Sequence, residues 1–179
     1  DALGKENVVG ITMPSRYSSE GSISDSQTLA DNLGLDLWEV PIEPAHHAFT
    51  DMLEERFKGT EANVAEENVQ ARVRGNVLMT VANKFGWIVL TTGNKSEMAM
   101  GYATLYGDMA GGLAILGDVY KTEVFELAEY INRNKEIIPQ NSIDKPPSAE
   151  LRPDQKDVDS LPEYDILDKI LFEYIENRN

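Results

Sequence analysis

The sequence predicts an α/β fold with a doubly wound parallel sheet. Short apolar runs rich in β-branched residues alternate with longer stretches in which apolar residues recur at helical spacing. Glycine or proline stands at several of the changes between the two kinds of segment. Strands that are apolar throughout and that alternate with helices indicate a parallel sheet covered by helices on both faces.

Two strands and one helix are predicted in the amino-terminal part of the chain. Residues 8–13 are an apolar run, residues 35–40 alternate between apolar and polar, and a proline follows each run. A helix between them is predicted to start at Ser22 or Ser24, either of which can cap it, and to stop at Gly34.

Two further helices are expected before the next strand. Asn63, with Glu66 three residues later, has the pattern of a capping box, and the long helix that it opens should end at Gly86. The preceding helix has one apolar face, formed by Phe49, Met52, Leu53 and Phe57.

The most strand-like run in the chain is residues 87–90, and a helix is predicted to begin after it at Asn94 or Lys95. The glycines of residues 101–117 lack dinucleotide-binding spacing, so they indicate a bending loop. A helix starting near Lys121 follows, with an apolar face formed by Val124, Leu127, Ala128 and Ile131.

The carboxyl-terminal part combines a long polar segment with one more helix. Residues 132–164 are rich in proline, asparagine, serine and aspartate, which is typical of a lid or a disordered linker. The last helix is predicted to be amphipathic, with apolar positions at Ile166, Ile170, Leu171 and Tyr174.

Composition excludes several functional classes. A chain of 179 residues that is 41% hydrophobic is most simply one globular domain. A net charge of −15 argues against a nucleic-acid surface, so any phosphate must be held locally by backbone amides, a few cations or a divalent ion. The sequence contains no run of 18 apolar residues, so no membrane span is predicted. The absence of cysteine excludes disulfides and fits a cytoplasmic protein.

The two histidines do not predict a metal site. His46 and His47 are adjacent, so on a helix their side chains point about 100° apart and cannot share a metal ion. We interpret both as residues of a helix surface.

Chemistry is expected at residues 91–97, which follow the best strand. Thr92 and Glu97 would lie at the carboxyl edge of a parallel sheet, where ligands bind in α/β folds. The alternative is purely structural, with Asn94 as the helix cap and Glu97 closing a capping box. The local pattern does not separate the two interpretations.

A second candidate group lies near the start of the long helix. Asn68 and Arg72 are four residues apart and share one face near the positive end of that helix, which suits a polar, anionic ligand. A solvated helix face is the simpler reading of the same pattern.

The chain resembles the NAD synthetases, in particular the synthetase domain of the glutamine-dependent type. The resemblance covers essentially the whole chain, and the blocks that carry it follow the family order. They are residues 67–76, 91–97, 106–112, 117–122, 147–151 and 161–164.

The resemblance implies a Rossmann-like fold of the adenine-nucleotide α-hydrolase type and an ATP pyrophosphatase reaction. Family members adenylate the nicotinate carboxylate of deamido-NAD with ATP and release pyrophosphate. Ammonia then displaces AMP to give NAD. In the glutamine-dependent type the ammonia comes from glutamine through a separate amidohydrolase domain on the same polypeptide. The family also implies a homodimer, and neither nucleic acid nor a membrane is expected as a partner.

The resemblance also implies roles for single residues. Thr92, Lys121 and Ser148 would bind ATP, with Lys121 near the phosphates and Ser148 closing over the nucleotide from the long loop. Asn68 and Arg72 would bind deamido-NAD. Glu97 would hold Mg²⁺ or lie beside deamido-NAD, and we expect Glu97 and Lys121 to be the catalytic pair.

The chain departs from the family pattern at both ends. Family members carry a Ser-Gly-Gly-x-Asp-Ser loop that cradles pyrophosphate and supplies a further magnesium ligand, and this loop is not in the sequence. We therefore expect residues 1–179 to be a single partial synthetase domain, cut off before residue 1 and after residue 179, and inactive alone.

Two other classes remain open. The chain could belong to another amidating ligase of the ATP pyrophosphatase type, which would share the phosphate loop but not residues 67–72 and 92–97. It could also be a non-catalytic nucleotide-binding module. Thermal shift with deamido-NAD against other nucleotides separates these readings.

Overall fold

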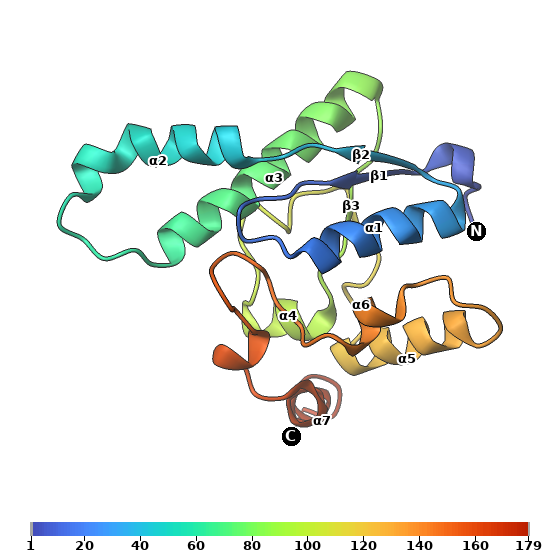
Figure 1. Ribbon diagram of the computed structural model, residues 1–179. Coiled ribbons are helices and arrows are strands. Elements are labelled where there is room, and N and C mark those ends of the chain that lie inside the picture. The colour runs from blue at the N-terminus through green and yellow to red at the C-terminus, as the bar shows by residue number, and fades with distance from the viewer. Residues whose placement is uncertain (1, 179) are drawn as a thin grey trace.

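The computed structural model describes residues 2–178 and has the alternation of strands and helices that the sequence predicts (Figure 1). In chain order its elements are η1 (Lys5–Asn7), β1 (Val9–Thr12), α1 (Glu20–Leu33), β2 (Asp36–Glu39), α2 (Glu43–Phe57), α3 (Val64–Phe85), β3 (Leu90–Thr91), α4 (Lys95–Met100), β4 (Leu113–Ala114), α5 (Lys121–Asn132), α6 (Gln140–Asp144), η2 (Asp157–Asp159) and α7 (Tyr164–Ile175).

The strands pair in parallel, as predicted, but they form two separate pairs within residues 2–178. β1 pairs with β2, placing Val9 opposite Asp36, and β3 pairs with β4, placing Leu90 opposite Leu113. The run at residues 87–90 was expected to be a longer strand, and pairing in fact begins at Leu90. Parallel strands joined through helices confirm the α/β class.

Glycine permits the close approach of the chain beside β3. A Cβ atom at Gly111 would come within 2.5 Å of the Thr91 side chain, and one at Gly112 within 2.8 Å of Ile88. A side chain at either position would therefore push β4 away from β3. The glycines at positions 111 and 112 are therefore required by packing against β3.

Hydrogen bonds and glycine conformations at the helix ends explain where two of the helices, α3 and α1, start and stop. The capping box of Asn63 and Glu66 opens α3, and Gly86 ends that helix in the left-handed conformation at φ 71°. α1 ends at Gly34 as predicted, but it starts about one turn earlier than expected. The Ser19 side chain is its cap, because it accepts a hydrogen bond from the Ser22 backbone amide.

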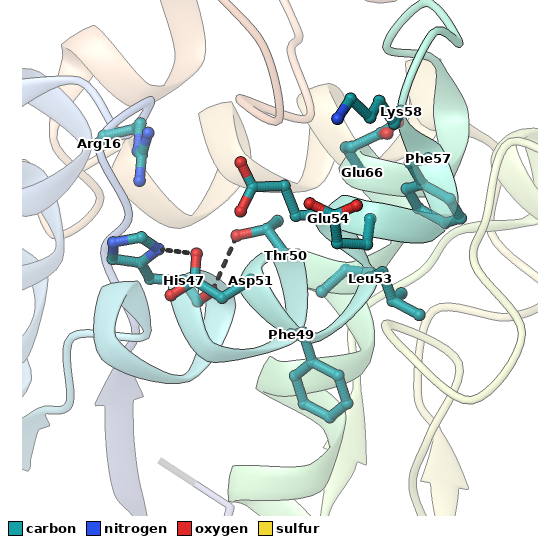
Figure 2. A pocket seen from close by; sticks show the side chains of 12 residues that line it. Arg16, His47, Phe49, Thr50, Asp51, Leu53, Glu54, Phe57, Lys58 and Glu66 are labelled. Carbon is teal, nitrogen blue, oxygen red and sulfur yellow. Dashed lines mark hydrogen bonds and ion pairs between the residues drawn. The ribbon is translucent and has the colours of Figure 1, made fainter.

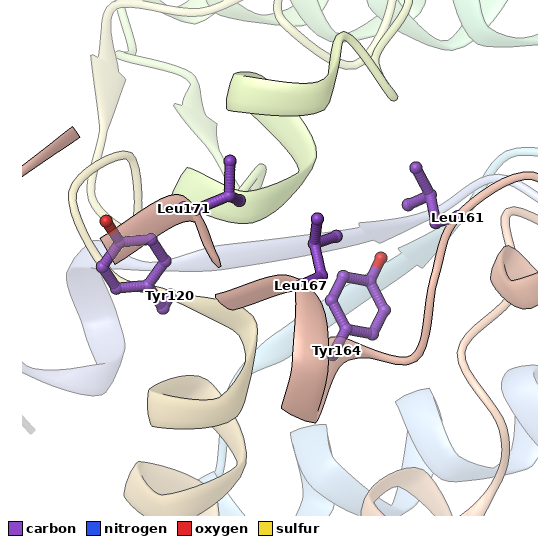
Figure 3. Close-up of a cluster of buried hydrophobic side chains, with 5 residues drawn as sticks. All are labelled: Tyr120, Leu161, Tyr164, Leu167 and Leu171. Atoms are coloured by element: carbon purple, nitrogen blue, oxygen red, sulfur yellow. The ribbon is translucent and has the colours of Figure 1, made fainter. Parts of the chain in front are cut away.

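The main apolar cluster lies where α7 packs against α4 and α5 (Figure 3). Its members are Tyr120, Leu161, Tyr164, Leu167 and Leu171, with Tyr102 packed against them. α7 is a helix as predicted, but the buried stripe differs from the expected one, since Ile166, Ile170 and Tyr174 are exposed. The stripe that packs inward runs through residues 164, 167, 168 and 171.

The expectation that His46 belongs to a helix surface was wrong. On α2, Phe49, Met52 and Phe57 are exposed, whereas His46, which we had placed on the surface, is 5% exposed. The residues 132–164 are not one structureless segment, because they contain α6, η2 and the buried Leu161. His47 is exposed, as expected. No helix within residues 2–178 is long and apolar enough to cross a membrane.

Candidate active site

Glu97 and Lys121 are brought together at the start of two helices. Glu97 is the third residue of α4, and its Oε2 accepts a hydrogen bond from the Asn94 backbone amide at 3.1 Å. Its Oε1 accepts a hydrogen bond from the Lys121 Nζ at 3.0 Å. The capping role and an ion-pairing role therefore coexist in one side chain, one on each oxygen.

The surroundings of this pair are partly shielded from water. The side chains of Lys121 and Glu97 are 18% and 20% exposed. The Lys121 Nζ also lies 5.4 Å from the centre of the Tyr164 ring, a distance at which a cation is attracted to an aromatic face. An ion pair with this little solvent is screened less than one on the open surface.

Thr92 lies at the edge where the sequence placed it. It directly follows β3, and its side chain is exposed at the carboxyl end of that strand. Gly93 and the Asn94 cap come next, so Thr92 lies in the turn from β3 into α4. This is the position at which parallel α/β sheets present groups to a ligand.

Asn68 and Arg72 both contact the loop that follows α4. The Thr104 hydroxyl donates to the Asn68 Oδ1 at 2.8 Å, and the Arg72 Nε donates to the Leu105 carbonyl at 3.2 Å. The same loop contains Tyr102, whose backbone amide donates to the Glu97 carbonyl at 2.8 Å. The loop of residues 101–108 thus links the two predicted groups of site residues.

Small residues let α3 lie directly against this loop. A Cβ atom at Gly75 would come within 2.8 Å of the Tyr106 carbonyl oxygen, and one at Gly107 within 2.9 Å of Ala71. This close packing fixes the first half of α3, and with it Asn68 and Arg72, relative to α4.

Ser148 lies apart from the other predicted site residues. It belongs to residues 145–156, the strap between α6 and η2, and its Oγ accepts a hydrogen bond from the Glu150 backbone amide at 3.1 Å. Within residues 2–178 it makes no hydrogen bond to Glu97, Lys121 or Thr92.

The strap is held by hydrogen bonds at several points. The Glu150 carboxylate accepts from the Ser19 hydroxyl at 2.9 Å and the Ser22 hydroxyl at 2.6 Å, both at the start of α1. Burial by itself would raise the pKa of Glu150, but the hydrogen bonds from Ser22 and Ser19 lower it overall. Gln70 on α3 donates to the Leu151 carbonyl at 2.8 Å.

A second anchor of the strap region is the buried Asp157, whose Oδ2 accepts a hydrogen bond from the Tyr164 hydroxyl at 2.8 Å. Burial, together with the Asp157 carboxylate, raises the pKa of Tyr102 to about 12 and also raises the pKa of Tyr164. Both phenols therefore stay neutral and can act as donors at ordinary pH.

Three polar residues that join these elements were missed from the sequence. Asp168 on α7 is buried and receives hydrogen bonds from Ser96 and Thr122, the neighbours of Glu97 and Lys121 in the chain. Arg74 donates from its Nε to the Met13 carbonyl at 3.0 Å just beyond β1, and burial lowers its pKa. Gln70 is 1% exposed.

The sequence did contain a signal for Asp168. An aspartate four residues after Tyr164 interrupts the apolar stripe of the helix, on the same face.

The described residues offer no ready-made metal cage. Within residues 2–178, no three histidine or carboxylate side chains form a group that could hold a metal ion. Mg²⁺ is nevertheless commonly bound by one or two carboxylates together with substrate phosphates and waters. Glu97 fits that limited requirement when the Lys121 Nζ leaves its Oε1.

A hollow of about 640 Å³ lies elsewhere, along α2 (Figure 2). It is lined by residues that include His47, Asp51, Glu54 and Glu66, and His47 pairs with Asp51 at 2.9 Å. None of the predicted site residues lines it. A cavity lined mainly by carboxylates and apolar side chains does not suit a phosphate ligand.

Fold and site together define a Rossmann-like α/β domain whose polar site lies at the carboxyl end of a parallel strand, between α3, α4 and α5. A sequence model of the NAD synthase family matches residues 1–179. The chain belongs to the NAD synthase family, which confirms the resemblance stated from its sequence blocks.

Curated relatives agree with this assignment. The chain is 58% identical over 178 residues to the glutamine-dependent NAD(+) synthetase of Thermotoga maritima, covering 98% of this chain and 31% of that protein. It is 56% identical over 176 residues to the enzyme of the same name from Synechocystis, covering 98% and 32%. The chain thus spans about a third of the length of these relatives.

Solved structures confirm the fold. The glutamine-dependent NAD+ synthetase of Acinetobacter baumannii, in complex with ADP, matches with a TM-score of 0.79 and 43% identity over 99% of this chain and 32% of that chain. The NMN synthetase of Francisella tularensis matches with a TM-score of 0.82 and 31% identity over 91% of this chain and 65% of that one.

Proposed function

We propose that this chain supplies part of the synthetase site of a glutamine-dependent NAD synthetase. In the reaction, a carboxylate oxygen of deamido-NAD attacks the α-phosphorus of ATP and pyrophosphate leaves. Ammonia then attacks the activated carbonyl carbon, loses a proton, and AMP leaves with the bonding electrons. The observation that carries the proposal is the Glu97–Lys121 pair beside the end of β3, in a chain 58% identical to an enzyme of that name.

The chemistry needs stabilisation of negative charge more than it needs a protein nucleophile. A carboxylate is a poor acyl donor, so adenylation supplies a leaving group, and ammonia already carries a nucleophilic lone pair. The phosphates of ATP and the departing pyrophosphate carry the charge that must be offset. We assign this task to the Lys121 ammonium group, which would turn from Glu97 toward the phosphates.

Glu97 has two possible duties once Lys121 has turned away. Bound Mg²⁺ would neutralise charge on the phosphates, and Glu97 would be its carboxylate ligand in this chain. Alternatively, Glu97 orients the nicotinate end of deamido-NAD. The partial shielding of the pair from solvent supports either duty, because electrostatic stabilisation is stronger where water is scarce.

The remaining predicted residues would bind the two nucleotides. Thr92, exposed after β3, would contact ATP, and Ser148 would close over it from the strap. Asn68 and Arg72 would bind deamido-NAD near the positive end of α3. The loop of residues 101–108, which contacts Asn68, Arg72 and Glu97, supports the placement of the dinucleotide beside the catalytic pair.

We also propose that the synthetase site is completed by segments outside these residues. The two separate strand pairs, with Ile88 and Leu113 exposed, support a further strand between them, followed by the pyrophosphate-binding loop. The chain spans about a third of the length of its relatives, which supports a separate amidohydrolase domain that supplies ammonia from glutamine. A cytoplasmic location fits the absence of cysteine.

A homodimer belongs to the same proposal. The exposed Phe49, Met52 and Phe57 of α2, with Val64 at the start of α3, give an apolar surface next to the helix that carries Asn68 and Arg72. Large exposed apolar side chains that gather in one place are typical of contact surfaces.

The test is NAD formation by the complete protein that carries this chain. With ATP, Mg²⁺, ammonia and deamido-NAD we expect NAD, AMP and pyrophosphate in equal amounts. The 179-residue chain alone should form no measurable NAD, since the pyrophosphate cradle is not among its residues. NAD formation by the isolated chain would contradict the proposed need for that loop.

A second candidate is another amidating ligase of the same fold, which the likeness to NMN synthetase favours. Nicotinate mononucleotide, offered in place of deamido-NAD, separates the two. Preference for the mononucleotide would replace the proposed substrate, while absence of turnover with either, together with a thermal shift by ATP, would favour the non-catalytic nucleotide-binding module.

A further inference from the structure

Asp168 lies at the junction of the three helices that surround the Glu97–Lys121 pair. It is on the buried stripe of α7 and is 6% exposed. Its Oδ1 accepts a hydrogen bond from the Ser96 hydroxyl at 2.5 Å, and its Oδ2 accepts hydrogen bonds from the Thr122 amide and hydroxyl, each at 2.8 Å. Within residues 2–178, no lysine or arginine forms a salt bridge with it.

The contacts of Asp168 fall on the residues next to the proposed catalytic pair. Ser96 directly precedes Glu97, and Thr122 directly follows Lys121. The Ser96 Oγ also accepts a hydrogen bond from the Lys121 backbone amide at 2.9 Å, which closes a ring of hydrogen bonds through Asp168, Ser96, Lys121 and Thr122. The ring fixes the start of α5 against α4.

Asp168 supplies from a different helix what α5 lacks in its own sequence. The N-cap residue of α5, Tyr120, makes no side-chain capping bond, so free amides remain at the helix start. A carboxylate from α7 satisfies one of them and places negative charge at the positive end of the helix. This interaction explains how an anion without a cationic partner is tolerated in the interior.

The identity of the side chain matters because every group facing it is a donor. A carboxylate only accepts, and here it accepts three hydrogen bonds. An asparagine must direct its amide hydrogens at one of these donors. Where the amide nitrogen faces Thr122, the Thr122 backbone amide loses its acceptor, and where it faces Ser96, the Ser96 hydroxyl must turn from donor to acceptor.

We infer that Asp168 is a positioning residue that fixes the first turns of α4 and α5 and so sets where the Lys121 side chain starts relative to Glu97, the resting partner of its amine. The importance of that geometry for catalysis rests on the proposed function, whereas the positioning itself does not. Reacting groups held in the productive geometry lower the barrier, and small displacements raise it steeply.

The test uses Asp168→Asn in the complete protein, with two controls on α7. Asp165→Asn makes the same chemical change at an exposed position of the same helix. Leu171→Ala weakens the apolar cluster without removing a member of the ring. Together they separate the loss of a charge and the loss of stability from the loss of position.

The first readout does not depend on any activity. Competitive acylation with acetic anhydride, followed by mass spectrometry, reports the reactivity of Lys121 relative to the exposed Lys84. In Asp168→Asn we expect Lys121 to be labelled several-fold faster, because its amine leaves Glu97. In both controls its labelling should stay at the wild-type level at temperatures well below the melting transition.

The second readout is steady-state kinetics of NAD formation. Asp168→Asn should lower kcat/KM for ATP by about tenfold or more. Leu171→Ala should lower the melting temperature without that loss. Should Asp168→Asn fail to fold, Thr122→Val removes one of the three hydrogen bonds and should raise Lys121 labelling to a smaller degree.

The outcomes separate the inference from the proposed function. Wild-type labelling of Lys121 in Asp168→Asn, or in Thr122→Val where only that variant folds, would overturn the inference and leave Asp168 as a structural cap. Faster labelling of Lys121, combined with no NAD formation by the wild-type protein, would support the inference and reject the function.

Discussion

The Nζ of Lys121 lies 3.0 Å from the Oε1 of Glu97, and the other oxygen of the same carboxylate caps α4 through the Asn94 amide. One side chain thus satisfies a helix start and holds a cation beside the end of a parallel strand. Capping needs a hydrogen-bond acceptor, whereas holding Lys121 or a metal ion needs the negative charge. The following prediction separates these demands.

Glu97→Gln should leave the fold nearly intact and damage the reaction. Glutamine keeps an oxygen for the Asn94 amide, so the free energy of unfolding should fall by at most about 1 kcal/mol. Turnover by the complete protein should fall by about a hundredfold, as expected for the loss of one electrostatic stabiliser. Added Mg²⁺ should restore part of the turnover if Glu97 is a metal ligand and none if it orients deamido-NAD.

Glu66→Gln is the matched control for this variant. Glu66 closes the capping box of α3 as Glu97 closes that of α4, but it has no salt bridge within residues 2–178. Its replacement should leave turnover unchanged. Similar turnover in the two glutamine variants would return Glu97 to a purely structural role.

Thr104→Val should weaken the proposed dinucleotide site selectively. The Thr104 hydroxyl donates to the Asn68 Oδ1 at 2.8 Å, and its loss removes the restraint that holds this amide. We expect KM for deamido-NAD to rise about five- to tenfold, the equivalent of one hydrogen bond, with KM for ATP unchanged. Thr80→Val, which removes a hydroxyl bonded within α3, should change neither constant. An equal rise in both constants would contradict a role at deamido-NAD alone.

His46 should make the protein less stable in mild acid. Burial lowers the pKa of His46 below its usual value near 6.5, an effect that the nearby Glu43 opposes and Arg16 and Arg74 reinforce. The unfolded chain therefore takes up a proton as the pH falls through about 6.5 while the folded protein does not. Stability is complete above that pH and declines below it.

His46→Leu removes this titration and two buried ring nitrogens that find no hydrogen-bond partner among residues 2–178. The free energy of unfolding, measured in urea from pH 7.5 to 5.5, should depend less on pH in this variant than in the wild type. His47→Leu, at an exposed position, should keep the wild-type dependence. An unchanged slope in His46→Leu would mean that other groups cause the decline.

Glu150 should anchor the strap as an anion. Its pKa is lowered overall by the hydrogen bonds from Ser22 and Ser19, which outweigh burial. Its contribution is therefore complete above the unfolded pKa of about 4.5 and is lost as the pH falls through the lower folded value. Glu150→Gln should be less stable than the wild type at pH 6, and this difference should shrink below about pH 4.5.

Hydrogen exchange at neutral pH shows which residues are loosened when the Glu150 carboxylate no longer anchors the strap. Amides of residues 145–157 should exchange faster in Glu150→Gln, while Asp154→Asn, an exposed change within the strap, should match the wild type. In the complete protein we still expect ATP and deamido-NAD to slow exchange across this segment. Identical exchange with and without both ligands would show that the strap is a fixed part of the fold.

Local hydrogen bonding explains which parts of the fold could be predicted. The caps at Asn63 and Asn94 each involve a glutamate three residues later, and the stops at Gly34 and Gly86 need only one residue with positive φ. Such features lie within a single turn of chain, so their residue pattern indicates them directly. The candidate residues Thr92 and Glu97 were proposed for the same reason, because they immediately follow a strand-like run.

The sequence by itself determined the α/β class, the helix starts at Asn63 and Asn94, and the residues with which chemistry was expected. Only the tertiary structure decided that α7 buries Asp168 instead of Ile166, that His46 faces inward, and that Glu150 bonds to the start of α1. The physical reason is that these contacts join residues that lie far apart in the sequence. A helix with apolar residues on several sides does not specify which side packs, and a carboxylate that caps another helix has its partners far away in the chain.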